Sequence, residues 1–193
     1  MRAIVGAIES GRLRAEPRLT VSNRPGTPAL AFAGAHGIPQ CVVPTKADPV
    51  RADRMLALAL AGAGVELVVL SGYLRKLGPE TLGAYANRIL NIHPALLPAF
   101  GGPGMYGRRV HEAVAASGVA ETGVTVHLVD DQYDHGPIVA TKHIGLDTGE
   151  SAASIEAKVT AAEPGFFVQV LQRIAEGALR LPQPSDPISD NLH

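Results

Sequence analysis

Three side chains suited to carbonyl chemistry stand close to the ends of predicted strands. Asn91 and His93 lie in the segment 91–98, which reads NIHPALLP, and Asp134 opens the segment 134–137, which reads DHGP. A carboxamide donates N–H bonds without titrating, an imidazole exchanges protons near neutral pH, and a carboxylate holds an imidazolium or orders a water. Together these groups suit a reaction that builds negative charge on a carbonyl oxygen while an amine loses a proton.

Each of these residues also has an ordinary structural explanation. An Asn at a strand end is commonly a turn residue, a lone His is commonly structural, and an Asp before Gly is common in turns. It is their combination at this spacing that favours a site. Pro94 and Pro98 fix the backbone that leaves the strand. Because ligands of open parallel sheets bind beyond the carboxyl ends of the strands, we expect the site there.

The elements that must position these residues alternate between helix and strand. The apolar run 67–70, bounded by Gly64 and Gly72, is typical of a strand covered on both faces. Helices are predicted near 3–11, 27–35, 49–63, 79–85, 110–116 and 151–177, and strands at 19–21, 41–43, 67–70, 88–92, 122–129 and 138–143. This order predicts an α/β fold with a Rossmann-like, doubly wound and mostly parallel sheet.

Two details of this order carry separate expectations. The strands 122–129 and 138–143 have no crossover helix between them, so we expect them to pair antiparallel. Pro164 falls inside the last helix, so we expect that helix to kink or split there.

Composition bounds the class of protein. The 193 residues, 46% apolar and 18% charged with a net charge of −1, fit one domain at 1–180 and a Pro-rich, flexible tail at 181–193. No basic stripe indicates nucleic acid, and no apolar run approaches the roughly 20 residues that span a bilayer. Cys41 is the single cysteine, which excludes an internal disulfide and suits a buried strand. The sequence therefore predicts a cytoplasmic protein. It also predicts no metal site, because the histidines lack paired ligand spacing.

The two motifs resemble the signature of a known family. The segment 91–98 is similar to the formyl-transfer motif of the folate-dependent formyltransferases, and 123–129, GVTVHLV, followed by 134–137 is similar to its second half. The similarity extends from about residue 3 to residue 177. It implies the formyltransferase type of sheet. It also implies transfer of a formyl group from 10-formyltetrahydrofolate, the co-substrate, to glycinamide ribonucleotide in purine biosynthesis. The implied partners are small-molecule substrates, with a homo-oligomer left open.

The resemblance also implies roles for the residues that match its motifs. Asn91 would bind the formyl oxygen and the oxyanion, and His93 would act as general acid–base or electrostatic partner. Asp134 would support His93 and a water that relays protons. Thr125 and His127 would be supporting members of the site. The residues alone leave open whether His127 belongs to the site or packs within an alternating strand.

Two further regions match ligand-binding parts of the family. The segment 73–77 resembles the lining of the pterin pocket, which makes Tyr73, Leu74, Arg75 and Leu77 candidate folate-binding residues. Glu163 falls where the family places a carboxylate near the ribonucleotide. A plain loop before a helix, with Arg75 solvated, and a surface Glu163 are the ordinary alternatives.

The opening of the sequence departs from the family pattern. There a central strand and a glycine-rich phosphate loop, Gly-x-Gly-Ser-Asn, precede the first helix, whereas residues 1–5 here fall on that helix. We therefore expect the usual first strand to be lacking, which leaves two unpaired sheet edges. Three interpretations stay open: a natural protein that starts earlier, a gap closed by another segment or chain, and a paralogue that no longer binds a ribonucleotide.

Other activities remain as alternatives. A relative could formylate another amine, such as an amino sugar, or hydrolyse formyl-folate, although the hydrolase motif resembles His-His where this chain has His93 and Pro94. Transfer to initiator tRNA is disfavoured, because the family's C-terminal domain and a basic surface are absent from the sequence. A non-catalytic folate-binding protein would explain the missing phosphate loop. The glycine-rich segment 101–107 is expected to form a mobile lid, with Arg108 and Arg109 behind it.

Overall fold

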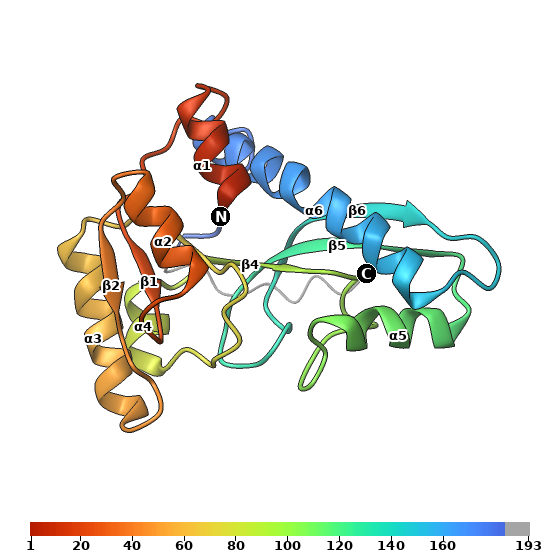
Figure 1. Cartoon of the computed structure of the whole chain (residues 1–193), viewed down its shortest axis with the longest axis horizontal. Coiled ribbons are helices and arrows are strands. Elements are labelled where there is room, and N and C mark those ends of the chain that lie inside the picture. Colours follow the sequence, from red (N-terminus) through yellow and green to blue (C-terminus); the bar gives the residue numbers. More distant parts are fainter. Residues whose placement is uncertain (184–193) are drawn as a thin grey trace.

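The computed structural model describes residues 1–183 and alternates helices and strands in the predicted order (Figure 1). Most of the bounds lie within one or two residues of the predicted ones. The helices are α1 (Arg2–Glu9), α2 (Pro28–Ala35), α3 (Pro49–Gly62), α4 (Pro79–Ala84), α5 (Arg108–Ser117) and α6 (Ala152–Ala175). The strands are β1 (Thr20–Ser22), β2 (Gln40–Val42), β3 (Val68–Val69), β4 (Ile89–His93), β5 (Glu121–Leu128) and β6 (Ile138–Gly145).

The strands of the described residues form two sheets. β1 pairs in parallel with β2, and a second sheet has the order β3-β4-β5-β6. β3 and β4 are parallel, whereas β5 runs antiparallel to both β4 and β6. The predicted antiparallel pairing of the last two strands is therefore confirmed, and the sheet is mixed, with its parallel pairs in the first half of the chain.

The two sheets turn unpaired edges toward a common cleft. In a parallel ladder every second residue bonds to the partner strand. Ser22 accepts a hydrogen bond from Val43 beside β2, at 2.9 Å, and Val68 donates one to the carbonyl that precedes β4, at 2.8 Å. The N–H and C=O groups of Val21 and Val69 therefore point away from those partners. A cleft of about 1510 Å³, lined by β1, β3, α1 and α3, lies beside these edges.

A buried apolar layer fixes β4 and β5, the strands that carry the candidate site. Leu90 and Val126, both fully buried, pack with Ala7 of α1 and with Phe167 and Leu171 of α6. A second cluster joins α5, β5 and α6, and a third joins α3, α4 and β4. Figure 1 shows α6 lying across the β5–β6 part of the sheet. These contacts make the centre of the sheet the rigid part of the fold.

The long helix α6 is continuous through Pro164, so the predicted alternative of a split there was wrong. A proline inside a helix removes one hydrogen bond and costs about 3 kcal/mol. Buried side chains lie on both sides of it, Ile155 and Val159 before and Phe167 and Leu171 after. Packing of these two halves against α5, β5 and α1 outweighs the lost bond, and a sequence pattern does not report such packing.

The beginning of the predicted tail is tied to the turn before β4. Arg88 donates a hydrogen bond to the Pro182 carbonyl at 2.8 Å, and Asn87 donates one to the Gln183 carbonyl at 3.1 Å. The rest of that tail, 184–193, lies outside the described residues. No helix in residues 1–183 combines the length and apolar character that crossing a membrane requires.

Candidate active site

The antiparallel pairing of β4 with β5 assembles the site. Asn91 lies directly opposite His127, and His93 lies directly opposite Thr125. Because side chains alternate along a strand, these four residues share one face of the sheet. The expectation of a site beyond the carboxyl ends of parallel strands was therefore wrong for β5. This strand runs backward past β4, so its interior residues, rather than its end, reach the site.

Thr125 holds the backbone that leaves β4. Its fully buried hydroxyl donates to the Ala95 carbonyl at 2.7 Å and accepts from the Leu97 N–H at 3.1 Å. Both bonds are made to the segment that follows His93. The hydroxyl thus fixes the exit of β4, and with it the setting of the imidazole.

Asp134 joins two imidazoles and the glycine-rich segment. Its Oδ1 lies 3.5 Å from His93 Nδ1 and 3.6 Å from His127 Nε2. Its Oδ2 accepts a hydrogen bond from the Gly102 N–H at 3.0 Å. Asp134 adopts a left-handed backbone conformation, with φ of 55°, which turns the loop after β5 back toward the sheet. One carboxylate therefore connects the three parts of the candidate site.

The surroundings of this carboxylate keep it ionised. Burial alone would raise the pKa of Asp134, but hydrogen bonding and charge from His93, together with the Gly102 N–H, oppose burial, and that pKa lies well below its ordinary value. His93 is only 3% exposed, and its Nε2 lies 2.7 Å from the Phe100 carbonyl oxygen. Both nitrogens of His93 thus face acceptors, an arrangement that the doubly protonated imidazolium satisfies with its two N–H donors. The site can present a positive charge to a developing oxyanion.

Asp134→Asn is expected to lower the free energy of unfolding at pH 7, by an amount that shrinks in acid. A carboxyl whose folded pKa is depressed contributes stability above its unfolded pKa of about 3.9 and loses it as the pH falls through the folded value. Urea unfolding followed by circular dichroism between pH 7 and pH 3 measures the difference. Asp131→Asn, an exposed change in the same loop, is the control. A difference that stays constant down to pH 3 would contradict the assignment.

The candidate folate-binding residues lie in the segment that follows β3. Leu77 is buried in the core, whereas Leu74 is 62% exposed. Tyr73 is half-buried, and burial raises its pKa, which the charge of Arg75 opposes and that of Asp53 reinforces. Tyr73, Arg75 and Leu77 line the large cleft. The segment therefore borders the cleft, as does Asp131 of the loop that carries Asp134.

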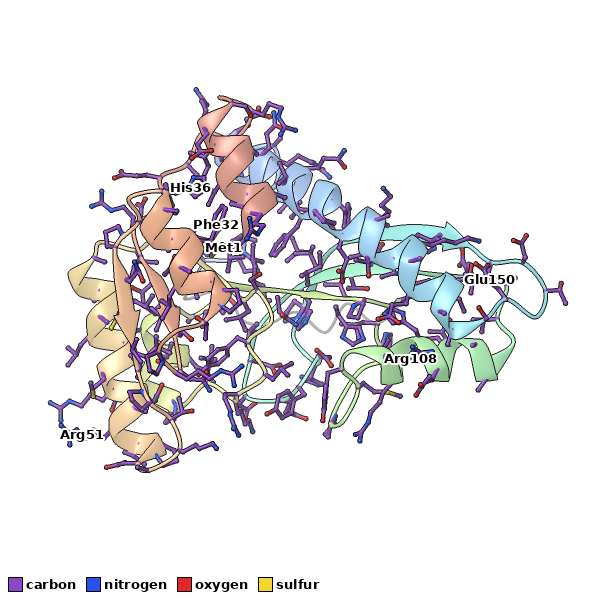
Figure 2. The ribbon with its side chains drawn as sticks, in the orientation of Figure 1. Met1, Phe32, His36, Arg51, Arg108 and Glu150 are labelled. Carbon is purple, nitrogen blue, oxygen red and sulfur yellow. The ribbon has the colours of Figure 1, made fainter. Side chains whose placement is uncertain are left out.

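Glu163 approaches from α6. It lines a smaller hollow of about 470 Å³ with Met1, Phe32 and Ile92; Figure 2 labels Met1 and Phe32, which lie close together. Ile92 alternates to the other face of β4 from Asn91 and His93. Burial raises the pKa of Glu163, and the charge of His93 opposes this rise. The hollow that Glu163 lines is thus on the side of β4 that Ile92 faces.

The two arginines behind the glycine-rich segment are engaged with near neighbours. Arg108, at the start of α5 (Figure 2), forms an exposed ion pair with Glu112 at 3.3 Å. The guanidinium of Arg109 lies 5.5 Å from the centre of the Tyr106 ring. Neither is buried, so both stand at the rim of the glycine-rich segment.

Sequence reasoning missed the groups that orient the imidazoles. The carbonyls of Phe100 and Leu128 and the N–H of Gly102 are backbone atoms, which carry no side-chain signal. His111 on α5 was also missed; it is 4% exposed, and burial lowers its pKa, with Glu156 opposing and His93 adding to the effect. Its place in an amphipathic helix was the one available signal.

Comparison with known proteins shows similarity to formyltransferases. The family model described as formyl transferase matches residues 1–171. The chain is 34% identical over 194 residues to the chloroplastic phosphoribosylglycinamide formyltransferase of Arabidopsis thaliana, an alignment covering 98% of this chain and 66% of that protein. It is 35% identical over 177 residues to the corresponding protein of Vigna unguiculata, covering 91% of this chain and 57% of that one. The chain thus spans less than two thirds of the length of each of these two relatives.

A solved structure gives the same result in three dimensions. The phosphoribosylglycinamide formyltransferase of Coxiella burnetii, solved in complex with CHES, superposes with a TM-score of 0.85 at 31% identity, covering 95% of this chain and 84% of that one. The match of the family model to most of the chain, together with the shared fold, shows that this chain belongs to the formyl transferase family.

Proposed function

We propose that this chain transfers the formyl group of 10-formyltetrahydrofolate to the amine of glycinamide ribonucleotide, a step of purine biosynthesis, in the cytoplasm. Its similarity to the phosphoribosylglycinamide formyltransferases of plants and of Coxiella supports the acceptor and the reaction. The observation that carries the proposal is the grouping of Asn91, His93 and Asp134 around one face of β4, with the imidazole 3.5 Å from the carboxylate.

In the proposed reaction a neutral amine attacks the formyl carbon. The C–N bond forms, negative charge moves to the formyl oxygen, and Asn91 and His93 stabilise that oxygen by N–H donation and positive charge. A water held by Asp134 takes the proton of the attacking amine, and a proton is returned to the folate nitrogen as its bond to the formyl carbon breaks. The protein forms no covalent bond, so positioning and preorganised charge supply the rate.

Other residues receive supporting roles in this proposal. Tyr73, Leu74, Arg75 and Leu77 would border the folate, and the cleft beside them is large enough for a ligand of that class. Glu163, whose carboxyl lies in a partly buried hollow, would face the amine of the ribonucleotide. Thr125 would act by fixing the loop after His93.

Separate binding and transfer measurements test the proposal. Calorimetry with a 10-formyltetrahydrofolate analogue and with glycinamide ribonucleotide should give binding of both, and mass spectrometry should detect formylated ribonucleotide only when both substrates are present. Folate binding without ribonucleotide binding would favour a non-catalytic folate-binding protein. Loss of formyl-folate without formylated product would favour hydrolysis, and product formation only with another amine would change the acceptor.

A further inference from the structure

His127 occupies an interior position of the sheet. Its side chain is 2% exposed, and its residue pairs with Asn91 across the two strands. The β5–β6 register shifts between Val126 and His127, so a bulge marks this position. A buried imidazole at a bulge has its ring orientation set by the hydrogen bonds that it makes.

The two nitrogens of this ring have different partners. Nδ1 lies 2.8 Å from the Leu128 carbonyl oxygen, which only accepts, so Nδ1 carries a proton and donates. Nε2 lies 3.0 Å from Nδ2 of Asn91, an amide nitrogen that only donates. A neutral imidazole with its proton on Nδ1 satisfies both contacts, because its Nε2 has a free lone pair.

The same lone pair determines which way the Asn91 carboxamide faces. With the amide turned over, its oxygen would meet the Nε2 lone pair and the hydrogen bond would be lost. In the observed orientation one N–H is held by His127 and the second N–H of the same nitrogen is left for another acceptor. In the described part of the chain, the structure records no other hydrogen bond to this carboxamide.

Asp134 is the other polar side chain that faces Nε2 of His127. Asp134 Oδ1 is farther from Nε2, at 3.6 Å, and the same oxygen lies 3.5 Å from His93 Nδ1. His93 therefore shares this carboxylate oxygen with His127, and its Nδ1 lies slightly nearer to the oxygen. The nearer and better matched partner of Nε2 is the Asn91 amide.

We propose that His127 is a positioning residue: as the neutral Nδ1–H form it accepts a hydrogen bond from Asn91 and fixes the end of that carboxamide which meets the reacting carbonyl. Its effect on turnover rests on the formyl transfer proposed above. The orientation itself is a property of the folded chain and is measurable without substrate.

A matched pair of variants separates the two ring contacts. The amide of a glutamine can place an oxygen near the position of Nε2, whereas the amide of an asparagine can place an N–H near the position of Nδ1. His127→Gln therefore keeps an acceptor for Asn91 and loses the bond to Leu128. His127→Asn keeps the bond to Leu128 and leaves Asn91 without its acceptor.

Steady-state kinetics should distinguish these variants. We expect His127→Asn to lower kcat about 10²-fold, as for a misplaced reacting group, with KM for the folate within about threefold, and His127→Gln to keep kcat within about tenfold of wild type. In an Asn91→Ala background His127→Asn should cause no further loss. The reverse order of the two variants, wild-type turnover in both, or equal losses in both folded proteins would overturn the proposal.

Nitrogen-15 NMR of the histidine rings gives a readout independent of catalysis. We expect His127 in the substrate-free protein to carry its proton on Nδ1, with the Asn91 side-chain amide signals shifted by His127→Asn and little changed by His127→Gln. A proton found on Nε2 alone would overturn the inference. If wild type showed the expected NMR pattern but transferred no formyl group, the proposed function would fail and the orientation of Asn91 would stand.

Discussion

His93→Ala is expected to abolish most formyl transfer while the protein stays folded. The imidazole is buried against Asp134 and the Phe100 carbonyl, so it is held where charge or a proton is needed. Loss of a positioned acid–base group costs about 10²–10⁴-fold in rate. Turnover under saturating substrates, together with thermal unfolding followed by circular dichroism, measures the two effects separately.

Two further variants sharpen this result. His93→Gln can keep an N–H donor near the Phe100 carbonyl but has no positive charge, so we expect a loss of turnover close to that of the alanine variant. His143→Ala removes an exposed imidazole that pairs with Glu121 on the neighbouring strand, at 3.2 Å, and should leave turnover near wild type. A correctly folded His93→Ala protein with near wild-type turnover would remove His93 from the mechanism.

Asn91→Ala is expected to lower kcat by about 10²–10³-fold, the usual cost of removing one donor to an oxyanion. The substrates should still bind, because the interaction matters most when the formyl oxygen carries charge. The measurement is kcat and KM for each substrate, with the change concentrated in kcat. Gln172→Ala, which removes a partly exposed carboxamide on α6 that is hydrogen-bonded to Glu176, serves as the control. A rise in KM with unchanged kcat would assign Asn91 to ground-state binding instead.

The sequence indicated which residues the fold brings together and did not indicate how they are arranged. Asn91, His93 and Asp134 were predictable because their chemistry is specific and two motifs surround them. The order of helices and strands followed from apolar periodicity and from glycine and proline positions. The direction of β5 did not follow, because α5 separates it from β4 as a crossover helix would. That direction is what places His127 opposite Asn91.

Contacts between parts of the chain that are distant in sequence explain the other differences. The unbroken course of α6 through Pro164 depends on buried residues of the helix on both sides of the proline, which pack against three other elements. The setting of both imidazoles depends on backbone carbonyls and on one N–H of the glycine-rich segment. Such groups occur in every residue, so a linear pattern does not distinguish the ones that matter.

One oxygen of Asp134 lies beside the two imidazoles, and the other accepts a hydrogen bond from Gly102. The position of the glycine-rich segment and the protonation of the site are therefore thermodynamically coupled. The bond from Gly102 helps to depress the pKa of the carboxyl, so withdrawal of that segment must raise it. Reciprocity then requires that adding a proton to Asp134 favours withdrawal by the same free energy. Opening of the face of β4 by the glycine-rich segment and ionisation of Asp134 are therefore linked in a single equilibrium.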